Sequence, residues 1–326
     1  MAGHRVKLGL VCTSGGHFEQ MVNLERFYKD YPHFWITSAG IQSQYHQKGK
    51  AMYVINMAHF KRPWTYVIQL PRLLPIFIKE RPTHLISTGS GRIVLLPYLL
   101  SLLFGAKFVH IETFSYVYRL TKMGAFLKKM GCPIFTQWQT PTLDGTTYIG
   151  PVFEKNAVEE DLIDREDLIF VSLGTRDEPF PRLIQAAEAL RNERFVRDRI
   201  IVQRGHTPFT SDAVELIDFA SPRTIDLLIK RARVVITQES AGLATKCLKY
   251  QTRFIVMPRE YGRGELPAKS DMNEDLHLKL QELGYTYVVH DVAELRAAMN
   301  KLDGLKVGFE FDNSLAIEKL TRLVNN

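Results

Sequence analysis

Residues 6–21, VKLGLVCTSGGHFEQM, contain the pattern that decides the fold. The apolar run VKLGLVC is typical of a buried strand, and two glycines follow where the chain has to turn. Phe18, Met21, Leu24 and Tyr28 then recur at steps of three, three and four residues, which places them on one face of a helix. A strand, a glycine turn and a helix in this order open a parallel α/β unit.

The same alternation runs through the chain in two sets. The first set continues with FWITSA, MYVINM, THLIST, AKFVHIE and PIFTQW, and the second comprises LIFVSLG, RIIVQRG, RVVITQ, RFIVMP and YTYVVH. Between the sets, residues 154–167 hold seven acidic residues in fourteen, which is typical of an exposed linker. We therefore predict two doubly wound parallel-sheet domains, residues 1–153 and 168–326, the second ending in a C-terminal helix.

Composition excludes some classes of protein. The three cysteines are far apart and form no CxxC pair, so neither a disulfide framework nor a zinc site is expected, and the N-terminus lacks a signal-peptide pattern. The net charge of +7 is uneven: residues 1–153 carry 17 Lys and Arg against 6 Asp and Glu, whereas residues 154–326 carry 25 against 29. The first half is therefore expected to face an anionic partner, either nucleic acid or a membrane surface.

Apolar stretches near these cations favour the membrane. No run reaches the roughly 18 apolar residues of a spanning helix. Residues 60–81 and 117–130 combine aromatic and aliphatic residues with Lys and Arg, the pattern of a helix lying on an anionic bilayer. Buried helices with solvated lysines are the alternative for both, and for residues 93–104 we predict a buried helix. The expected location is peripheral, without a spanning helix.

Chemistry is expected where the strands of a parallel sheet end. In the first half these places are Ser14-Gly15-Gly16-His17, Gly89-Ser90-Gly91-Arg92 and Glu112. In the second half they are Gly174-Thr175-Arg176, Gln203-Arg204-Gly205, Glu239-Ser240-Ala241-Gly242 and Arg259. Glycine turns let backbone N–H groups approach an anion, although none of these is a GxGxxG or P-loop motif and a tight turn is the alternative. The helix opened by Ser240 is a plausible diphosphate seat.

Two such domains with ligand loops are the layout of a two-domain glycosyltransferase with a common cleft. The first half resembles the acceptor-binding subunit of two-part transferases that extend lipid-linked sugars. The motifs are LVCTSGGHFEQM, LISTGSG, FGAKFVHIETFSYVYRLTKMG, IFTQW and YIGPVF. The second half resembles the donor-binding partner, through IFVSLGT, IIVQRGHT, VVITQESAGLATKCLKYQTRFIVMPRE and NEDLHLKLQELG. Such pairs include the dolichol-pathway N-acetylglucosaminyltransferase and a bacterial exopolysaccharide pair; the peptidoglycan enzyme that makes lipid II is a more distant relative.

The resemblance implies a fused enzyme with the GT-B fold. It implies inverting transfer from a UDP-sugar to a polyprenyl-diphosphate-linked saccharide at the cytoplasmic face of the membrane, with no cofactor and no metal. His17 matches the family's histidine and is the expected base for the acceptor hydroxyl, with Glu112 as the rival base. Residues 174–176 match the loop that closes on the nucleotide, residues 203–205 a loop near the uracil, and residues 240–242 the diphosphate-binding helix start.

Three positions depart from the family pattern. Lys246 replaces a glutamate used on the ribose, residues 238–240 replace His-Ala-Gly, and Asn273-Glu274-Asp275 replaces Asn-His-Gln. Glu239 is the carboxylate left for the ribose, and Asn273 and Asp275 are expected near the sugar. Because Lys246, Arg259 and Arg263 would place cations near the donor, UDP-glucuronic acid is the expected donor, with UDP-GlcNAc or UDP-galactose as alternatives.

Other functions stay open at this point. A UDP-sugar epimerase on the same fold would need no lipid acceptor, and the basic apolar segments argue against it. A nucleic-acid-binding protein would lack any recognised motif here. An inactive relative is the third alternative, because several donor-site positions differ.

Overall fold

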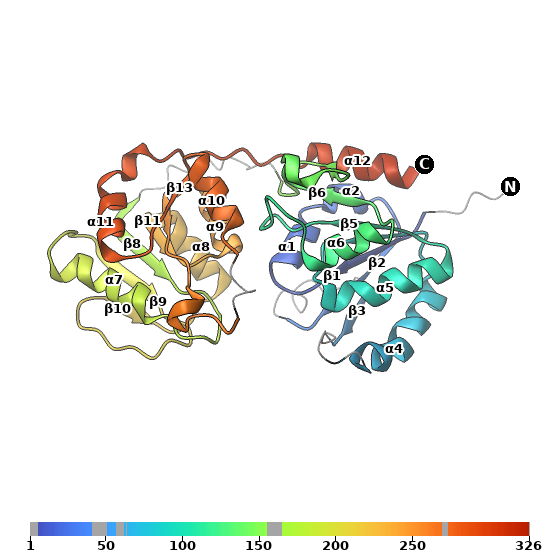
Figure 1. The fold of residues 1–326 in the computed structure, drawn as a ribbon, viewed down its shortest axis with the longest axis horizontal. Helices are drawn as coiled ribbons and strands as arrows, with labels where there is room; N and C mark the ends of the chain where they lie inside the picture. Colours follow the sequence, from blue (N-terminus) through green and yellow to red (C-terminus); the bar gives the residue numbers. More distant parts are fainter. Residues whose placement is uncertain are drawn as a thin grey trace. The chain divides into compact units, whose positions relative to one another are not determined.

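The computed structural model describes residues 6–40, 51–56, 62, 64–154, 165–268 and 273–325. The chain forms two compact units, one of residues Met1–Asn156 with Phe311–Asn326 and the other of residues Ala157–Glu310. Of the predicted linker 154–167, residues 155–164 lie outside the described part. Each unit is a parallel sheet between layers of helices (Figure 1).

In the first unit, the described residues form a seven-stranded parallel sheet in the order β3-β2-β1-β4-β5-β6-β7. Its strands are β1 Leu8–Cys12, β2 His33–Ser38, β3 Met52–Ile55, β4 His84–Ser87, β5 Lys107–Ile111, β6 Ile134–Thr136 and β7 Thr147–Tyr148. The helices are α1 Gly16–Val22, α2 Glu25–Tyr28, α4 Trp64–Glu80, α5 Gly91–Phe104, α6 Lys122–Lys129 and α12 Ser314–Asn325, with a 3-10 turn at Pro141–Leu143.

Side-chain alternation along the central strands divides the core of this unit in two. Leu8, Leu10 and Cys12 of β1 pack with α1, α2 and α12, whereas Val11 packs with α4, α5 and α6 on the other face. The predicted helical face is buried as expected, although the chain breaks at Leu24 into α1 and α2.

In the second unit, the described residues form a six-stranded parallel sheet in the order β10-β9-β8-β11-β12-β13. Its strands are β8 Glu166–Ser172, β9 Arg199–Gln203, β10 Glu215–Ile217, β11 Ala232–Thr237, β12 Phe254–Val256 and β13 Thr286–Val288. The helices are α7 Pro181–Asn192, α8 Pro222–Arg231, α9 Ala241–Lys249, α10 Asp275–Glu282 and α11 Val292–Asn300, with 3-10 turns at Tyr261–Arg263 and Leu302–Gly304.

The strand predictions are confirmed, since each of the eleven predicted runs contains a strand. The short edge strands β7 and β10 were not predicted, because neither lies in an apolar run long enough to stand out.

Two sequence expectations are wrong. The C-terminal helix α12 does not belong to the second domain: Ala316, Leu320 and Val324 are buried in the core of the first unit. The apolar stripe of α12 predicts that the helix packs against a sheet, but it does not specify which of the two sheets. Residues 93–104 form α5, which is buried on one face only, since Leu102 and Leu103 are 58% and 73% exposed.

Candidate functional site

The centre of the first sheet is a topological switch point. Strands β1 and β4 are neighbours, but the chain leaves β1 into α1 on one face of the sheet and leaves β4 into α5 on the other. A crevice beyond the strand ends is the usual ligand site of such sheets. The two predicted glycine turns, residues 13–16 and 88–91, both lie there.

Glycine is favoured in each of these two turns for a different structural reason. Gly15 has φ +93°, a backbone conformation that favours glycine, and a Cβ on Gly15 or Gly16 would meet nothing within 4 Å. The start of α1 therefore borders open space. A Cβ on Gly89 would lie 3.2 Å from the Cα of Cys12, so glycine there lets the turn after β4 approach β1.

His17 lies in the first turn of α1, where its backbone oxygen accepts a 2.8 Å hydrogen bond from Thr88 Oγ1. The ring is partly exposed, but its Nδ1 is buried and has no hydrogen-bond partner among the described residues. Burial lowers the pKa of His17, so the ring is neutral near pH 7. A neutral imidazole at a strand end is the protonation state that a general base requires.

A second histidine, His110 of β5, was not among the predicted site residues. It is buried, and its Nδ1 lies 3.4 Å from Ser87 Oγ at the end of β4. Burial, and secondarily the charge that His17 carries when protonated, lower the pKa of His110 to about 3. The signal in the sequence was a polar residue inside the apolar run AKFVHIE.

Glu112, the predicted rival base, is bound to its own loop. Its Oε1 accepts from Thr113 N at 3.0 Å, and its Oε2 accepts from Thr121 N at 2.9 Å and Thr121 Oγ1 at 3.0 Å. Burial raises the pKa of Glu112, and these hydrogen bonds oppose the shift. The carboxyl group therefore orders residues 113–121 and the start of α6.

Two buried glutamines join this loop to α1. Gln20 Oε1 accepts from Phe114 N at 3.2 Å and from Gln137 Nε2 at 2.6 Å. Gln137 also donates to Glu112 O at 2.9 Å and accepts from Val152 N at 3.0 Å. The helix that carries His17 is thus tied to the ends of β5 and β6.

The remaining residues predicted in this unit form a turn and the start of a helix. Ser14 N donates to Ser38 Oγ at 2.9 Å, which fixes the turn after β1. Ser90 precedes α5 and Gly91 begins it. The side chain of Arg92 lies outside the described part of the structure.

The second sheet has its own switch point, between β8 and β11. Gly174 has φ +73°, and a Cβ there would lie 2.1 Å from Gln238 Nε2. Gly205 has φ +57°, and its Cβ would lie 2.8 Å from Gly174 O. The loops after β8, β9 and β11 therefore meet at one edge, as predicted, at a spacing that excludes side chains on both glycines. Gln203 is also buried there, with Oε1 3.1 Å from Ser172 Oγ.

Helix α9 begins at this edge with a capped first turn. Ser240 Oγ accepts from Leu243 N at 3.3 Å, and the helix starts at Ala241. A Cβ on Gly242 would meet nothing within 4 Å, so the backbone is accessible at this point. These features suit the predicted diphosphate seat, because a helix N-terminus attracts anions.

Charged side chains surround the start of α9. Arg176 Nη1 lies 3.8 Å from Glu239 Oε1, and its Nε donates to Glu178 at 3.3 Å. The Arg176 side chain is 35% exposed, whereas that of Glu239 is 6% exposed. Thr175 is exposed next to Arg176. Arg176 therefore combines access to solvent with a position beside the start of α9.

Arg259, predicted at the donor site, is buried among partners within the protein. It is 2% exposed, donates to Gln238 Oε1 at 2.5 Å and to Glu178 O at 2.7 Å, and stacks on Phe180. Its backbone N–H donates to Glu239 Oε2 at 2.9 Å. A buried guanidinium with this many partners holds the loops after β8, β11 and β12 together.

The other predicted cations are also paired. Lys246 Nζ donates to Asp226 of α8 at 2.6 Å, Arg263 to Glu260 at 2.8 Å and Arg204 to Asp218 at 2.6 Å. The sequence around Lys246 shows its charge. It does not show that the partner is Asp226, which is twenty residues away on another helix. Asp275 begins α10 and Asn273 precedes it by two residues; their predicted place near the sugar stays a prediction.

Two aromatic residues were missed beside Gly205. His206 and Phe219 are in edge contact, with ring centroids 4.9 Å apart, and both are largely exposed. A Cβ on Gly205 would lie 3.7 Å from Phe219. Phe219 follows the apolar residues Leu216 and Ile217, and no local pattern in the sequence singles it out.

Neither a metal site nor a spanning helix is found in the part of the chain that the structure describes: no three His, Cys, Asp or Glu side chains cluster to hold a metal ion, and no helix is long and apolar enough to cross a membrane.

No protein-family model and no curated protein sequence matches the chain. Solved structures do match it over nearly its whole length. The glycotransferase of kitacinnamycin is 15% identical with a TM-score of 0.64, covering 99% of this chain and 95% of that one. MurG of Acinetobacter baumannii is 12% identical with a TM-score of 0.61 and the same coverage. UDP-GlcNAc 2-epimerase of Methanocaldococcus jannaschii, in complex with UDP-GlcNAc and UDP, is 12% identical with a TM-score of 0.67, covering 98% and 99%. The chain therefore has the GT-B fold, and at these identities the likeness establishes the fold alone.

Proposed function

We propose that this protein is a UDP-sugar glycosyltransferase that acts on a polyprenyl-diphosphate-linked saccharide at a membrane surface. The proposal combines the GT-B fold with one observation, an exposed apolar and basic face on the unit that contains His17. An enzyme with two water-soluble substrates has no need of such a face.

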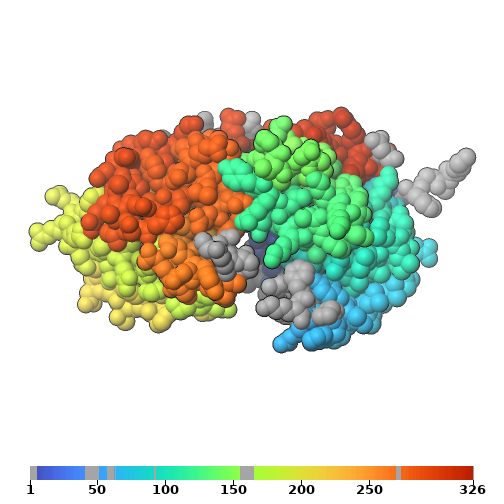
Figure 2. Space-filling model, viewed as in Figure 1, coloured from blue at the N-terminus to red at the C-terminus, as the bar shows by residue number. Residues whose placement is uncertain are grey.

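This membrane face is formed by α4, α5 and α6. Its exposed apolar side chains are Trp64, Val67, Ile68, Leu70, Ile78, Leu99, Leu102, Leu103, Phe104, Phe126 and Met130. Helices α4 and α5 pack on each other, as do α5 and α6, so the exposed side chains belong to adjoining helices. In the space-filling view, α4 and α5 form a continuous stretch of the surface of the first unit (Figure 2).

Cations accompany the apolar residues of the membrane face. Lys79 lies at the end of α4, and Lys122, Lys128 and Lys129 lie on α6. Exposed apolar side chains with nearby lysines support binding to an anionic bilayer. Of the predicted segment 60–81, residues 60, 61 and 63 lie outside the described part, and α5 joins the face although the sequence suggested otherwise.

Flotation with vesicles tests the membrane contact. The protein should float with vesicles that contain an anionic lipid, and a Val67→Ser/Leu103→Ser variant should remain at the bottom of the gradient. Leu227→Ser on α8 is the control: Leu227 is an exposed apolar residue of the second unit, at 50% exposure, and this variant should float like the wild type.

On the donor side, the β8–β11 switch point supports UDP binding. The Ser240-capped start of α9 suits the diphosphate, Arg176 can offset its charge, and the exposed ring of Phe219 offers a face on which a base can stack. Without a metal, transfer would rely on such backbone dipoles and cations to stabilise the leaving diphosphate.

On the acceptor side, we assign His17 as the base. His17→Ala should abolish most transfer of radiolabelled sugar to a lipid-linked acceptor, while leaving UDP binding intact. Glu112→Gln should lower stability more than turnover, because Glu112 holds its loop. Unchanged turnover in His17→Ala together with loss in a folded Glu112→Gln would make Glu112 the base.

UDP-glucuronic acid stays the proposed donor, on the sequence departures alone. The cations first considered for its carboxylate, Lys246, Arg259 and Arg263, all have partners within the protein. A panel of UDP-sugars decides between donors, and faster turnover of UDP-GlcNAc or UDP-galactose would reject glucuronic acid.

A UDP-sugar epimerase is the second candidate, favoured by the match to UDP-GlcNAc 2-epimerase over nearly the full length of both chains. Incubation with UDP-GlcNAc in the absence of any acceptor distinguishes the two. An epimerase would convert UDP-GlcNAc to its C2 epimer, whereas the proposed transferase should leave it unchanged.

A further inference from the structure

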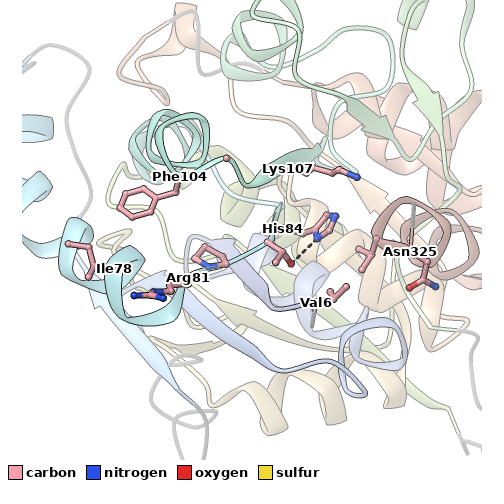
Figure 3. Close-up of a pocket in the computed structure, with 11 residues that line it drawn as sticks. Val6, Ile78, Arg81, His84, Phe104, Lys107 and Asn325 are labelled. Atoms are coloured by element: carbon pink, nitrogen blue, oxygen red, sulfur yellow. Dashed lines mark hydrogen bonds between the residues drawn. The ribbon is translucent and has the colours of Figure 1, made fainter. Parts of the chain in front are cut away.

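A second cavity lies at the opposite edge of the first sheet, where its strands begin. Its volume is about 770 Å³, within the usual range for small-ligand sites. It lies where α4 and α5 end and β4 and β5 start, and its lining includes Ile78, Arg81, His84, Phe104, Lys107 and Asn325 (Figure 3). None of these residues belongs to the switch-point site described above.

His84 is the buried polar group of this cavity. It is 6% exposed, and its buried Nε2 has no hydrogen-bond partner among the described residues. A buried polar atom without a partner is costly, so the group calls for a ligand or water in the cavity. In Figure 3, His84 lies between Arg81 on one side and Lys107 and Asn325 on the other.

A hydrogen bond to Thr83 holds the ring of His84 in place. Thr83 Oγ1 lies 3.0 Å from His84 Nδ1, and it also accepts from Lys7 N at 3.0 Å. One nitrogen of a neutral imidazole is a donor and the other an acceptor, so Nε2 has one hydrogen bond to offer in either tautomer. A hydroxyl group of a ligand suits Nε2, because a hydroxyl both donates and accepts.

The rim combines charge with apolar surface. Arg81 and Lys107 are exposed cations, and Lys107 is near enough to His84 to contribute, after burial, to lowering the pKa of that ring. Ile78 and Phe104 are 54% and 37% exposed and belong also to the membrane face. The ends of α4 and α5 carry partial negative charge, so an anion here depends on Arg81 and Lys107.

We propose that this cavity binds the head group of an anionic phospholipid that carries hydroxyl groups. The phosphate is held by Arg81 and Lys107, a head-group hydroxyl forms a hydrogen bond with His84 Nε2, and the acyl-bearing glycerol lies against Ile78 and Phe104. The site rests on the proposed membrane contact for its source of lipid, and it would add lipid selectivity to a face that is otherwise apolar.

Soluble short-chain lipids test the site without a bilayer or any sugar transfer. Dihexanoylphosphatidylglycerol, below its micelle concentration, is titrated into the full chain by calorimetry, beside dihexanoylphosphatidylcholine and glycerol phosphate. Phosphatidylglycerol should bind at least about tenfold more tightly than either, a difference of about 1.4 kcal/mol. Equal affinity for glycerol phosphate would identify a free phosphate ester as the ligand and overturn the lipid assignment; equal affinity for phosphatidylcholine, or no binding, would overturn the site.

Three variants locate the binding. Arg81 has φ +46°, so Arg81→Gly removes the charge at a backbone position that suits glycine, and it should weaken binding about tenfold. Arg194→Gly, at φ +54° in the second unit, is the matched control and should bind like the wild type. His84→Asn keeps a polar group near Thr83 while removing Nε2, and it should also weaken binding.

The outcomes separate this site from the membrane face. Unchanged affinity in both Arg81→Gly and His84→Asn would overturn the proposal, whatever the protein does on vesicles. Loss of flotation in Val67→Ser/Leu103→Ser with retained binding of soluble lipid would instead leave the cavity assigned and the membrane face as a separate element.

Discussion

Gln137 lies directly after β6, at the carboxyl edge of the first sheet. It is 2% exposed and bonds three groups: Gln20 Oε1 at 2.6 Å, Glu112 O at 2.9 Å and Val152 N at 3.0 Å. In Gln137→Leu, Gln20 Oε1 keeps its bond from Phe114 N. Glu112 O and Val152 N, by contrast, lose the side chain that pairs with them.

The magnitude follows from these two backbone groups. Each buried group left without a partner costs about 1–3 kcal/mol, and the added leucine regains part of this by burying apolar surface. We expect the free energy of unfolding of the first unit to fall by about 3 kcal/mol. Gln139→Leu is the control: Gln139 is two residues further along and exposed, so the change should stay within about 0.5 kcal/mol.

The chain provides a selective probe for this measurement. All three tryptophans, Trp35, Trp64 and Trp138, belong to the first unit, so tryptophan fluorescence during urea unfolding reports on that unit alone. A loss below about 1 kcal/mol in Gln137→Leu, or an equal loss in Gln139→Leu, would refute the reasoning, because the orphaned groups would then have found other partners.

Three further predictions concern pH and the second unit. His110 is protonated below about pH 6.5 in the unfolded chain but only near about pH 3 when folded. Because the unfolded chain binds the extra proton between these values, the free energy of unfolding should fall as pH drops, by up to about 1.4 kcal/mol per pH unit, and His110→Asn should remove that part of the slope in tryptophan-detected unfolding. Gly174→Ala should destabilise the second unit by about 1–2 kcal/mol because its φ is +73°, whereas Gly242→Ala, inside a helix with open space at Cβ, should be neutral or stabilising in denaturation followed by circular dichroism. Arg259→Leu should cost about 3 kcal/mol or more, whereas the exposed Arg263→Leu should stay within about 0.5 kcal/mol; equal losses would contradict a structural role for the buried guanidinium.

Sequence patterns predicted the strands and the positions of the ligand loops because both depend on neighbouring residues. The apolar runs ending at Cys12 and Ser172 are strands, and the glycine turns after them lie at the carboxyl edge. Helix periodicity likewise predicted the buried face of α1 and α2. The protein's double parallel α/β organisation therefore follows from local order along the chain.

Partners distant in the sequence required the tertiary structure. Gln20 and Gln137 are 117 positions apart, and nothing in either local stretch indicates their hydrogen bond. The charges of Lys246 and Arg259 were visible, but their engagement with Asp226 and Gln238 was not.

By itself, the sequence determined where the chain is extended, where it turns and which loops reach the ligand edge, because periodicity and glycine conformation act over a few residues. Only the tertiary structure decided that α12 packs on the first sheet and that one face of α5 is exposed. It also decided that Glu112 orders a loop, while Nδ1 of His17 has no hydrogen-bond partner among the described residues. Those outcomes depend on which surfaces meet, and a one-dimensional pattern specifies that a face is apolar without specifying what covers it.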